Sequence, residues 1–293
     1  MIALWKNRKF ENEFLGINER NMSYVYRLNA KEFFALADDK IKCKEVLHEH
    51  KIECAETYMV IRRIGDIPAA ISAMDQYGAL AIKPANGSGG GGILILRKGD
   101  GGHWISGGKP FSDRELYTHL ARILLGMYSF GSSDHVLIEE CIEPHDFFAE
   151  IYPKGVPDFR VILVNNQPVM SMLRVPTDRS DGKANLHQGG IGIGIDTVEG
   201  VLKQGFDGQE YHDHHPDNNC QILGKKIPMW DDLISLATRT SSVFPLNYLG
   251  VDIVIDKNLG PLIMEINVRP GLSIQLANKQ GLKPILNQFI IKN

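Results

Sequence analysis

Short apolar runs separated by turn residues dominate the hydrophobic pattern of the chain. These runs predict strands at 57–61, 80–82, 93–96, 136–138, 159–164, 169–175, 251–255 and 262–267. An amphipathic helix is predicted over 231–244, where apolar residues recur along one face. Further helices are expected after residue 38, at 68–74 and at 113–128. The pattern therefore predicts several strand pairs joined by turns, with a few helices between them.

The most distinctive stretch is a glycine-rich loop between the apolar runs at 80–82 and 93–96. All of residues 87–92 except Ser88 are glycine. Glycine leaves backbone N–H groups unobstructed and tolerates positive φ, so several amides can converge on one anion. Lys83 stands just before the loop and would add a cation at the same place. These features predict a strand–loop–strand flap that binds phosphate.

The glycine loop departs from three better-known phosphate-binding motifs. Gly87, Gly89 and Gly92 match G-x-G-x-x-G, but the dinucleotide-binding fingerprint must open a helix, and a strand-like run follows here. No Gly-Lys-Ser/Thr sequence follows, which excludes a Walker A loop. Protein kinases place their lysine after the loop and carry His-Arg-Asp and Asp-Phe-Gly strings, which this sequence lacks. The glycines alone would also fit a mobile surface hairpin.

A hairpin near the C-terminus carries three oxygen-bearing side chains within apolar strands. If residues 257–260 form a four-residue loop, antiparallel pairing sets Asp252 opposite Glu265, with Cβ atoms roughly 5 Å apart. Asn267 follows on the same face. Opposed carboxylates repel unless a cation separates them, and these oxygens suit Mg²⁺ bound together with substrate phosphates. An exposed polar sheet face is the alternative. Together, the flap and this hairpin indicate ATP chemistry.

Composition and charge are those of an ordinary globular protein of 293 residues, with room for one large domain or two packed lobes. A net charge of −3 predicts no general attraction to nucleic acid or anionic membranes. The four cysteines form no C-x-x-C pair, which favours reduced thiols. The N-terminus lacks a signal-peptide pattern, and no segment approaches the roughly 18 apolar residues of a membrane span. We therefore expect a cytoplasmic, soluble protein.

A histidine-rich segment at 211–220 raises a zinc hypothesis. The candidate ligands are His212, His214, His215 and Cys220. Their spacing matches no standard zinc finger, and His, Asp, Pro and Asn are common in surface loops. We prefer a polar loop near the substrate entrance.

Seven strings between Asp38 and Gly271 resemble motifs of the ATP-grasp superfamily and occur in the family's order. They are DDKIKCK, AIKPANGSGGGG, VLIEECIE, DFRVILVN, ANLHQGG, GVDIVI and MEINVRPG. The likeness is closest to carboxylate–amine ligases of the ribosomal-protein glutamate ligase type. MEINVRPG followed by LSIQLAN is more similar to the sugar-transfer-associated branch.

This resemblance implies an α+β ATP-grasp fold in which two α+β lobes clamp ATP. Residues 1–39 would form a short N-terminal extension that packs on the body, in place of a full preceding domain. Residues 40–138 would form the small lobe with the glycine flap, and residues 139–293 the large lobe with the magnesium hairpin.

The resemblance also implies roles for individual residues, with ATP and Mg²⁺ as cofactors and Mn²⁺ as an alternative metal. Lys40 and Lys83 would bind the phosphates, and residues 139–142 would form the hinge that reads adenine. The full expected nucleotide-binding set is Lys40, Lys83, Gly87, Ser88, Gly89, Gly90, Gly91, Glu139, Glu140, Cys141, Ile142, Asp158 and Arg160. The expected metal ligands are Asp252, Glu265 and Asn267.

Three further residues are expected to be catalytic by resemblance. Arg174 and Asn185 would face the transferring phosphate, and Arg269 could bind an acidic substrate. Because Arg160 and Arg174 lie in apolar strands, either could instead be solvated on a strand face.

The activity that the resemblance implies is ATP-dependent ligation of a carboxylate to an amine, with glutamate among the candidate carboxylates. Transfer of the γ-phosphate would form an acylphosphate, and attack by the amine would release phosphate and leave an amide. His187 is a candidate general base, although a lone histidine in a polar loop is commonly solvated. A kinase-type phosphotransferase and a non-catalytic nucleotide-binding module are the alternatives. Expected partners are small-molecule or peptide carboxylates and amines, without nucleic acid or membrane insertion; a homo-oligomer is left open.

Overall fold

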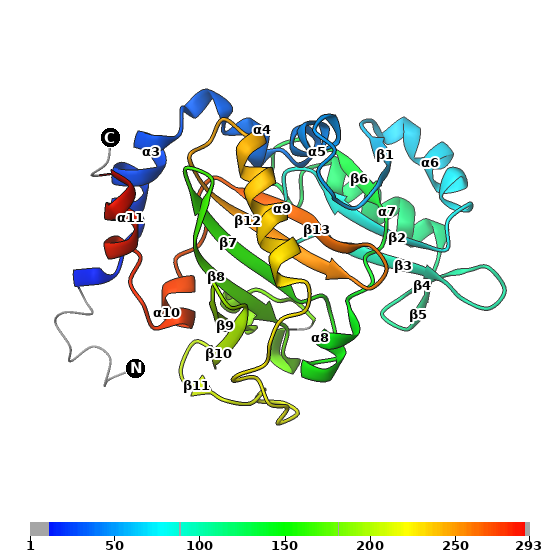
Figure 1. Ribbon diagram of the computed structural model, residues 1–293. Helices are drawn as coiled ribbons and strands as arrows, with labels where there is room; N and C mark the ends of the chain where they lie inside the picture. Colours follow the sequence, from blue (N-terminus) through cyan, green and yellow to red (C-terminus); the bar gives the residue numbers. More distant parts are fainter. Residues whose placement is uncertain (1–11, 88, 181, 291–293) are drawn as a thin grey trace. The chain divides into compact units, whose positions relative to one another are not determined.

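The computed structural model describes residues 12–87, 89–180 and 182–290, which form two compact units (Figure 1). Among the described residues, the large unit comprises 12–38, 42–54, 143–180 and 182–290, and the small unit comprises 39–41, 55–87 and 89–142. These bounds differ from the expected division at residues 40 and 139. Helix α5 (Lys40–Glu49) begins in the small unit, but its buried Leu47 belongs to the core of the large unit.

The small unit is built on an antiparallel sheet of six strands in the order β1-β6-β2-β3-β4-β5. The strands are β1 (Thr57–Ile61), β2 (Ala79–Pro84), β3 (Leu94–Lys98), β4 (Trp104–Ser106), β5 (Lys109–Phe111) and β6 (Val136–Glu139). The helical segments are η3 (Ile64–Asp66), α6 (Ile67–Met74) and α7 (Asp113–Leu124). Leu80 and Ile82 of β2 pack with Leu116 and Leu120 of α7 in one buried cluster. Alternation along β2 therefore directs Lys83 to the opposite face of the sheet.

Helix α7 is shorter than the sequence predicts. It begins with a capping box in which the Ser112 Oγ accepts from the Glu115 backbone N–H, and the Glu115 carboxylate accepts from the Ser112 N–H. It ends at Leu124, because Gly126 adopts φ 75° and the position of a Cβ there would lie 2.1 Å from the Ser132 carbonyl oxygen. The predicted end at residue 128 is therefore wrong.

The large unit is built on an antiparallel sheet of seven strands in the order β11-β10-β9-β8-β7-β12-β13. The strands are β7 (Asp158–Val164), β8 (Gln167–Val175), β9 (Ile191–Asp196), β10 (Val201–Phe206), β11 (Tyr211–His212), β12 (Tyr248–Asp256) and β13 (Gly260–Asn267). Asn165 and Asn166 form the two-residue turn between β7 and β8 and adopt φ of 49° and 63°. Asparagine tolerates such positive φ, which two-residue hairpin turns require.

Helices cover the large unit's sheet and complete its buried core. The amphipathic helix predicted over 231–244 is confirmed as α9 (Trp230–Val243), which lies across β12 and β13 in Figure 1. The other helical segments are α2 (Ile17–Glu19), η1 (Arg20–Val25), α3 (Tyr26–Leu28), η2 (Lys31–Phe33), α4 (Ala35–Asp38), α8 (Asp146–Ile151), η4 (Asp178–Ser180), η5 (Leu186–Gln188), α10 (Ile274–Asn278) and α11 (Lys283–Ile290).

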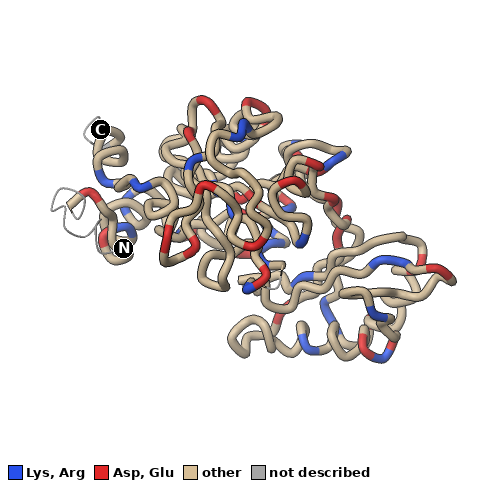
Figure 2. Tube along the Cα trace, turned by 90° about the horizontal axis from the view of Figure 1, so that it is seen from below, with Lys and Arg blue, Asp and Glu red and all other residues tan. Residues whose placement is uncertain are grey.

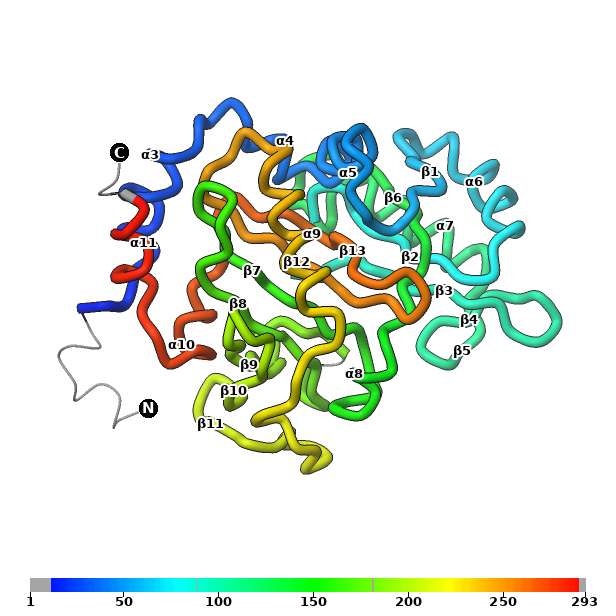
Figure 3. The backbone as a smooth tube through the Cα atoms, in the orientation of Figure 1, coloured from blue at the N-terminus to red at the C-terminus, as the bar shows by residue number. Residues whose placement is uncertain are grey.

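The N-terminal helices pack against the last helix of the chain, as the adjacent blue and red segments of Figure 3 show. The Tyr24 hydroxyl donates to the Asn287 Oδ1 at 3.0 Å, and the Lys283 Nζ lies 2.7 Å from the Glu19 Oε2. Arg20 donates to the Pro270 carbonyl oxygen at 2.7 Å. The described N-terminal residues up to Asp38 thus form part of the large unit.

Charged residues of both signs are interspersed along the chain (Figure 2), in keeping with the net charge of −3. Among the helices of the described residues, none is both long enough and apolar enough to cross a membrane.

Candidate functional site

The glycine loop joins β2 to β3 in the small unit, so the predicted strand–loop–strand arrangement is confirmed. Gly89, Gly90 and Gly92 adopt φ of 63°, 74° and 76°, values that L side chains rarely adopt. The Lys40 Nζ donates to the Gly87 carbonyl oxygen at 2.8 Å. Ser88 lies outside the described residues. The loop therefore combines an unusual backbone course with a lysine bound directly to it.

Lys83 is buried beside the loop and paired with a carboxylate on the adjacent strand. Its Nζ lies 2.7 Å from the Glu139 Oε2, and the two residues are 9% and 1% exposed. Their positions follow from register, because β2 pairs Ala81 with Glu139 and Lys83 with Leu137. Glu139 thereby fixes the direction in which the buried ammonium group points.

The sheet face that carries Lys83 and Glu139 also carries apolar side chains. Ala81 pairs with Ile95 on β3, and Lys83 pairs with Leu137 on β6, so Ile95 and Leu137 share this face. Ile95 is 38% exposed, although isoleucine is usually buried. Neither residue was predicted as part of the site, although the alternation of side chains along β3 places Ile95 on the same sheet face as Lys83. An apolar surface beside a buried cation suits a ligand with an apolar ring and an anionic group.

The segment expected to read adenine, residues 139–142, begins at Glu139, the last residue of β6. The Glu140 N–H donates to the Glu56 carbonyl oxygen at 2.9 Å, and the Glu56 N–H donates to the Glu140 Oε2 at 3.4 Å. Cys141 and Ile142 are half-buried and lie outside regular secondary structure. The strand pairing of β6 therefore ends at Glu139, at the start of this segment.

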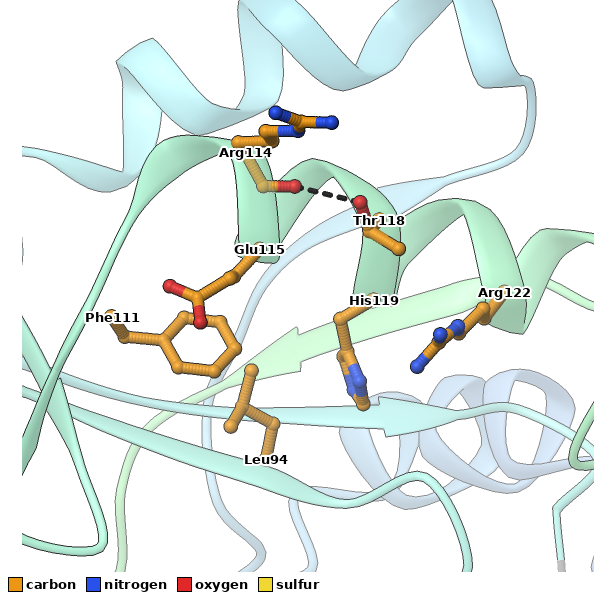
Figure 4. Close-up of a pocket in the computed structure, with 7 residues that line it drawn as sticks. All are labelled: Leu94, Phe111, Arg114, Glu115, Thr118, His119 and Arg122. Atoms are coloured by element: carbon orange, nitrogen blue, oxygen red, sulfur yellow. Dashed lines mark hydrogen bonds between the residues drawn. The ribbon is translucent and has the colours of Figure 1, made fainter.

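A pocket of about 410 Å³ lies on the other face of the small unit's sheet, where Figure 4 shows α7 above β3. Its lining residues are Leu94, Phe111, Arg114, Glu115, Thr118, His119 and Arg122. Leu94 pairs with Ile82 on the core side of β2, so the sheet separates this pocket from Lys83. The pocket is therefore not the predicted phosphate site.

A cluster of three buried charged residues and the half-buried Asp158 lies on three adjacent strands of the large unit. Arg160 of β7 forms two parallel hydrogen bonds to Asp252 of β12, at 2.8 Å from Nε to Oδ1 and 2.6 Å from Nη2 to Oδ2. Arg174 of β8 donates from Nη2 to Asp252 at 2.9 Å and to Asp158 at 2.8 Å. Both arginines are at most 9% exposed. The alternative of a solvated strand-face arginine is therefore wrong for both.

Charge pairing sets the protonation states in this cluster. Burial alone would raise the pKa of Asp252, but the guanidinium groups of Arg160 and Arg174 hold it well below its usual range. The pKa of Asp158 is raised, mainly by burial and also by the nearby Asp252 carboxylate, against the opposing effect of Arg174. Burial would lower the pKa of Arg174, but Asp158 and Asp252 raise it. Two carboxylates and two guanidinium groups thus form a compact, mutually compensated array.

The C-terminal hairpin pairs the predicted residues through a different loop. Asp256 pairs with Gly260, so residues 257–259 form the loop, and the predicted four-residue loop is wrong. A one-residue irregularity between Asp252 and Ile253 then shifts the register, and Asp252 does lie opposite Glu265. The Asn267 Nδ2 donates to the Asp252 Oδ2 at 3.1 Å. The three predicted oxygen-bearing side chains are therefore brought together.

Comparison with known proteins assigns the chain to a family. The profile of the family described as sugar-transfer associated ATP-grasp matches residues 19–290. The chain belongs to this family. A protein named probable alpha-L-glutamate ligase from Ectopseudomonas mendocina is similar to this ATP-grasp chain, with 23% identity over 278 residues, 94% of this chain and 71% of the relative.

Two further comparisons set the extent of the likeness. A protein of the same name from Vibrio parahaemolyticus is 29% identical over 102 residues, and the match spans 34% of this chain and about a third (32%) of that relative. The solved structure of D-alanyl-alanine synthetase A from Vibrio cholerae superposes with a TM-score of 0.53 at 12% identity, over 90% of this chain and 66% of that chain. The predicted α+β ATP-grasp fold is thereby confirmed.

Magnesium binding is typical of the ATP-grasp fold, and the donor set of the C-terminal hairpin fits this ion. The Asp252 Oδ2 already accepts from Arg160, Arg174 and Asn267, so its Oδ1 is the better placed oxygen for a metal. Because Asn267 donates through Nδ2, its Oδ1 can serve as a ligand. Glu265, opposite Asp252, adds a half-buried carboxylate. Two carboxylates and one carboxamide are a donor set that suits Mg²⁺.

The remaining predicted catalytic residues of this ATP-grasp protein have protein partners in the large unit. The Arg269 guanidinium lies 4.9 Å from the centre of the Phe34 ring, and its Nη1 is 3.5 Å from the Asp38 Oδ2. The Asn185 Oδ1 accepts from the His187 N–H at 3.1 Å and caps η5, while the His187 side chain is exposed. The roles expected for Arg269, Asn185 and His187 stay predictions.

The histidine-rich segment has structural contacts within the ATP-grasp large unit. His215 is 1% exposed, stacks on Tyr152 with 4.6 Å between ring centres, and its Nε2 lies 3.0 Å from the Pro176 carbonyl oxygen. The His212 Nε2 lies 3.3 Å from the Asp207 Oδ2. Across residues 12–87, 89–180 and 182–290, no three His, Cys, Asp or Glu side chains form a group that could hold a metal ion. The segment thus supports the loop that begins at Pro176.

Proposed function

We propose that this ATP-grasp protein is an ATP-dependent carboxylate–amine ligase. The observation that carries the proposal is the glycine flap between β2 and β3, with Lys83 buried and held by Glu139 on the sheet face beside it. A flap of positive-φ glycines with two lysines matches the shape and charge of a polyphosphate. Family membership gives this arrangement its chemical context.

In the proposed nucleotide site, different residues bind the phosphates and the base of ATP. Lys40 and Lys83 would neutralise phosphate charge, and Ile95 would offer its exposed apolar side chain to the base. Backbone groups of residues 139–142 would read the adenine edge. Phosphoryl transfer depends on positioning and charge neutralisation more than on a protein nucleophile, which is the kind of site these residues make.

In the large unit, the proposed site is the metal hairpin and the charge cluster beside it. Asp252, Glu265 and Asn267 would hold Mg²⁺, which when bound neutralises negative charge on phosphate oxygens. Arg160 and Arg174 orient Asp252 through direct hydrogen bonds, and Arg174 also offers positive charge to a transferring phosphate.

The proposed reaction proceeds through an acylphosphate. The γ-phosphate passes to an oxygen of the substrate carboxylate and ADP leaves; the amine nitrogen then attacks the acyl carbon, phosphate leaves, and the amine loses a proton. Two relatives carry the name probable alpha-L-glutamate ligase, so L-glutamate is the first carboxylate to test.

The test measures ADP release and product mass with Mg-ATP, L-glutamate and a panel of amines and peptides. Parallel reactions contain hydroxylamine, which traps an acylphosphate as a hydroxamate. We expect carboxylate-dependent ADP release with an amide or hydroxamate product, and loss of both in Lys83→Met and Glu265→Gln. A stable phosphorylated product would indicate a kinase-type phosphotransferase instead. Mg-ATP binding without turnover on any carboxylate would indicate a nucleotide-binding module.

A further inference from the structure

Both ends of the glycine flap are held by residues of α7 and the loop that follows it, residues 125–135, here named the anchor loop. At the start of the flap, the Asn86 backbone N–H donates to both carboxylate oxygens of Asp134, at 3.0 and 3.2 Å. The Asn86 Nδ2 also donates to the Asp134 Oδ1 at 3.0 Å. Three hydrogen bonds to one carboxylate therefore fix the residue that precedes Gly87.

Asp134 is itself locked within the small unit. It is 2% exposed, the Ser129 hydroxyl donates to its Oδ2, and the His135 N–H donates to its Oδ1 at 2.7 Å. A buried carboxylate is costly unless hydrogen bonds compensate it, so a residue that only closed a surface loop would not need this charge. The proposed phosphate chemistry makes no other use of Asp134.

The far end of the flap rests on two aromatic rings. The His119 Nε2 lies 3.0 Å from the Gly92 carbonyl oxygen, and the His119 and Tyr128 ring centres are 5.8 Å apart. A Cβ added at Gly92 would lie 2.6 Å from the Tyr128 Cδ2, so the backbone there packs directly on the ring. Burial lowers the pKa of His119, which favours the neutral ring with its Nε2–H donating to Gly92.

We propose that Asp134 and His119 are positioning residues that hold the two ends of the flap, at Asn86 and Gly92, in the backbone course that binding of the ATP phosphates requires. The inference rests on the proposed ATP-binding function. Ends that are already held in place lower the conformational entropy that nucleotide binding must remove. Neither residue touches the phosphates in this account; each acts through the flap backbone.

The experiment compares hydrogen–deuterium exchange of the flap peptide, with and without Mg-ATP, together with the Kd for Mg-ATP. The variants are Asp134→Asn, His119→Leu and the conservative His119→Gln, which retains an N–H donor. Matched controls are Asp100→Asn and His103→Gln, because both residues are exposed in the turn between β3 and β4. Thermal unfolding reports separately on folding of each variant.

We expect Mg-ATP to protect the wild-type flap amides. Asp134→Asn and His119→Leu should reduce that protection and raise the Kd about tenfold, the change expected for one lost hydrogen bond to a critical loop. His119→Gln should recover most of the affinity, and both controls should match wild type. If Asp134→Asn does not fold, the two His119 variants decide.

Two results would overturn the inference, and they are distinguishable. Wild-type protection that persists unchanged in folded Asp134→Asn and His119→Leu would refute the anchoring role alone. A wild-type flap that neither binds Mg-ATP nor gains protection would refute the proposed nucleotide site and the anchoring role with it.

Discussion

The glycine flap of the small unit and the charge cluster of the large unit are held in their conformations by different kinds of contact. The flap is mostly backbone, with positive-φ glycines and hydrogen bonds concentrated at its two ends. The cluster is mostly side chain, with Asp158, Arg160, Arg174 and Asp252 each held by at least one ionic partner. Backbone conformation therefore defines one region, and paired side-chain charges define the other.

The difference shows how each region obtains its geometry. Strand register sets the cluster, because β7 lies between β8 and β12 and pairs Asp158 with Arg174 and Arg160 with Asp252. Loop contacts set the flap, since sheet pairing stops at Ile82 and Leu94. Changes in the cluster should therefore act mainly on stability, and changes in the flap mainly on ligand binding.

Breaking the charge cluster should give the largest effect on stability. Asp252→Ala removes the carboxylate that accepts from Arg160 and Arg174 and leaves buried positive charge uncompensated, which should cost about 3–5 kcal/mol of unfolding free energy. Urea unfolding measures it. Glu265→Gln is the matched control, because the change preserves shape at a half-buried position and should stay within about 1 kcal/mol. Equal losses in the two variants would contradict the account of a fixed cluster.

The buried Lys83–Glu139 ion pair should stabilise the small unit as the charge cluster stabilises the large unit, but by a smaller amount. Lys83→Met should cost about 2–3 kcal/mol, because it leaves the buried Glu139 carboxylate without its ammonium partner. Adding Glu139→Gln should recover part of that loss, since the buried charge is then removed as well. The double-mutant cycle by chemical denaturation measures the coupling. Strictly additive losses would show that the pair makes no energetic contribution.

Two glycines of the flap compare a position packed against a ring, Gly92, with an open position, Gly90. Gly92→Ala introduces a Cβ at φ 76° within 2.6 Å of the Tyr128 ring, and should cost about 2 kcal/mol. Gly90→Ala has φ 74° but no neighbouring atom within 4 Å, so only the backbone cost of about 1 kcal/mol should remain. Thermal unfolding of the pair checks the difference. A larger loss for Gly90→Ala would mean that the flap end is not packed as described.

The smallest expected effect is a pH dependence from His119. Burial lowers its pKa in the folded protein, with a further lowering from Arg122, while the Gly92 carbonyl opposes the shift. The unfolded chain therefore binds more protons between the folded-state pKa and about 6.5, and the unfolding free energy falls as the pH drops through that window. His119→Gln should flatten this slope. His215, whose pKa is also lowered by burial, remains in both proteins, so only the difference between them is informative.

The sequence predicted much of the fold because its signals were local. The glycine loop, the asparagine turn at 165–166 and the alternation in β12 and β13 each identify neighbouring strands within one short stretch. The pairing of Asp252 with Glu265 was predicted correctly from an incorrect loop length, because the register shift beside Asp252 offset the error. The family-motif strings supplied the rest of the fold.

Long-range partners account for what the sequence did not reveal. Arg160 and Asp252 are 92 positions apart, so their hydrogen bonds depend on strand order, which no local pattern gives. Asp134 also bonds to a distant residue, because Asn86 lies 48 positions away. No local sequence pattern distinguishes Asp134 from other aspartates in loops. The contact of the Arg269 guanidinium with the Phe34 ring likewise joins residues far apart in the sequence, and the substrate-binding role expected for Arg269 stays a prediction.

The metal dependence of ATP binding tests the central claim most directly, because it needs no knowledge of the substrates. Isothermal titration with ATP should be done with and without Mg²⁺ on the wild type, Lys83→Met and Glu265→Gln. We predict that Mg²⁺ strengthens ATP binding to the wild type, that Glu265→Gln loses this enhancement, and that Lys83→Met binds weakly under both conditions. Wild-type protein that binds no ATP, or whose affinity is independent of Mg²⁺, would contradict the account.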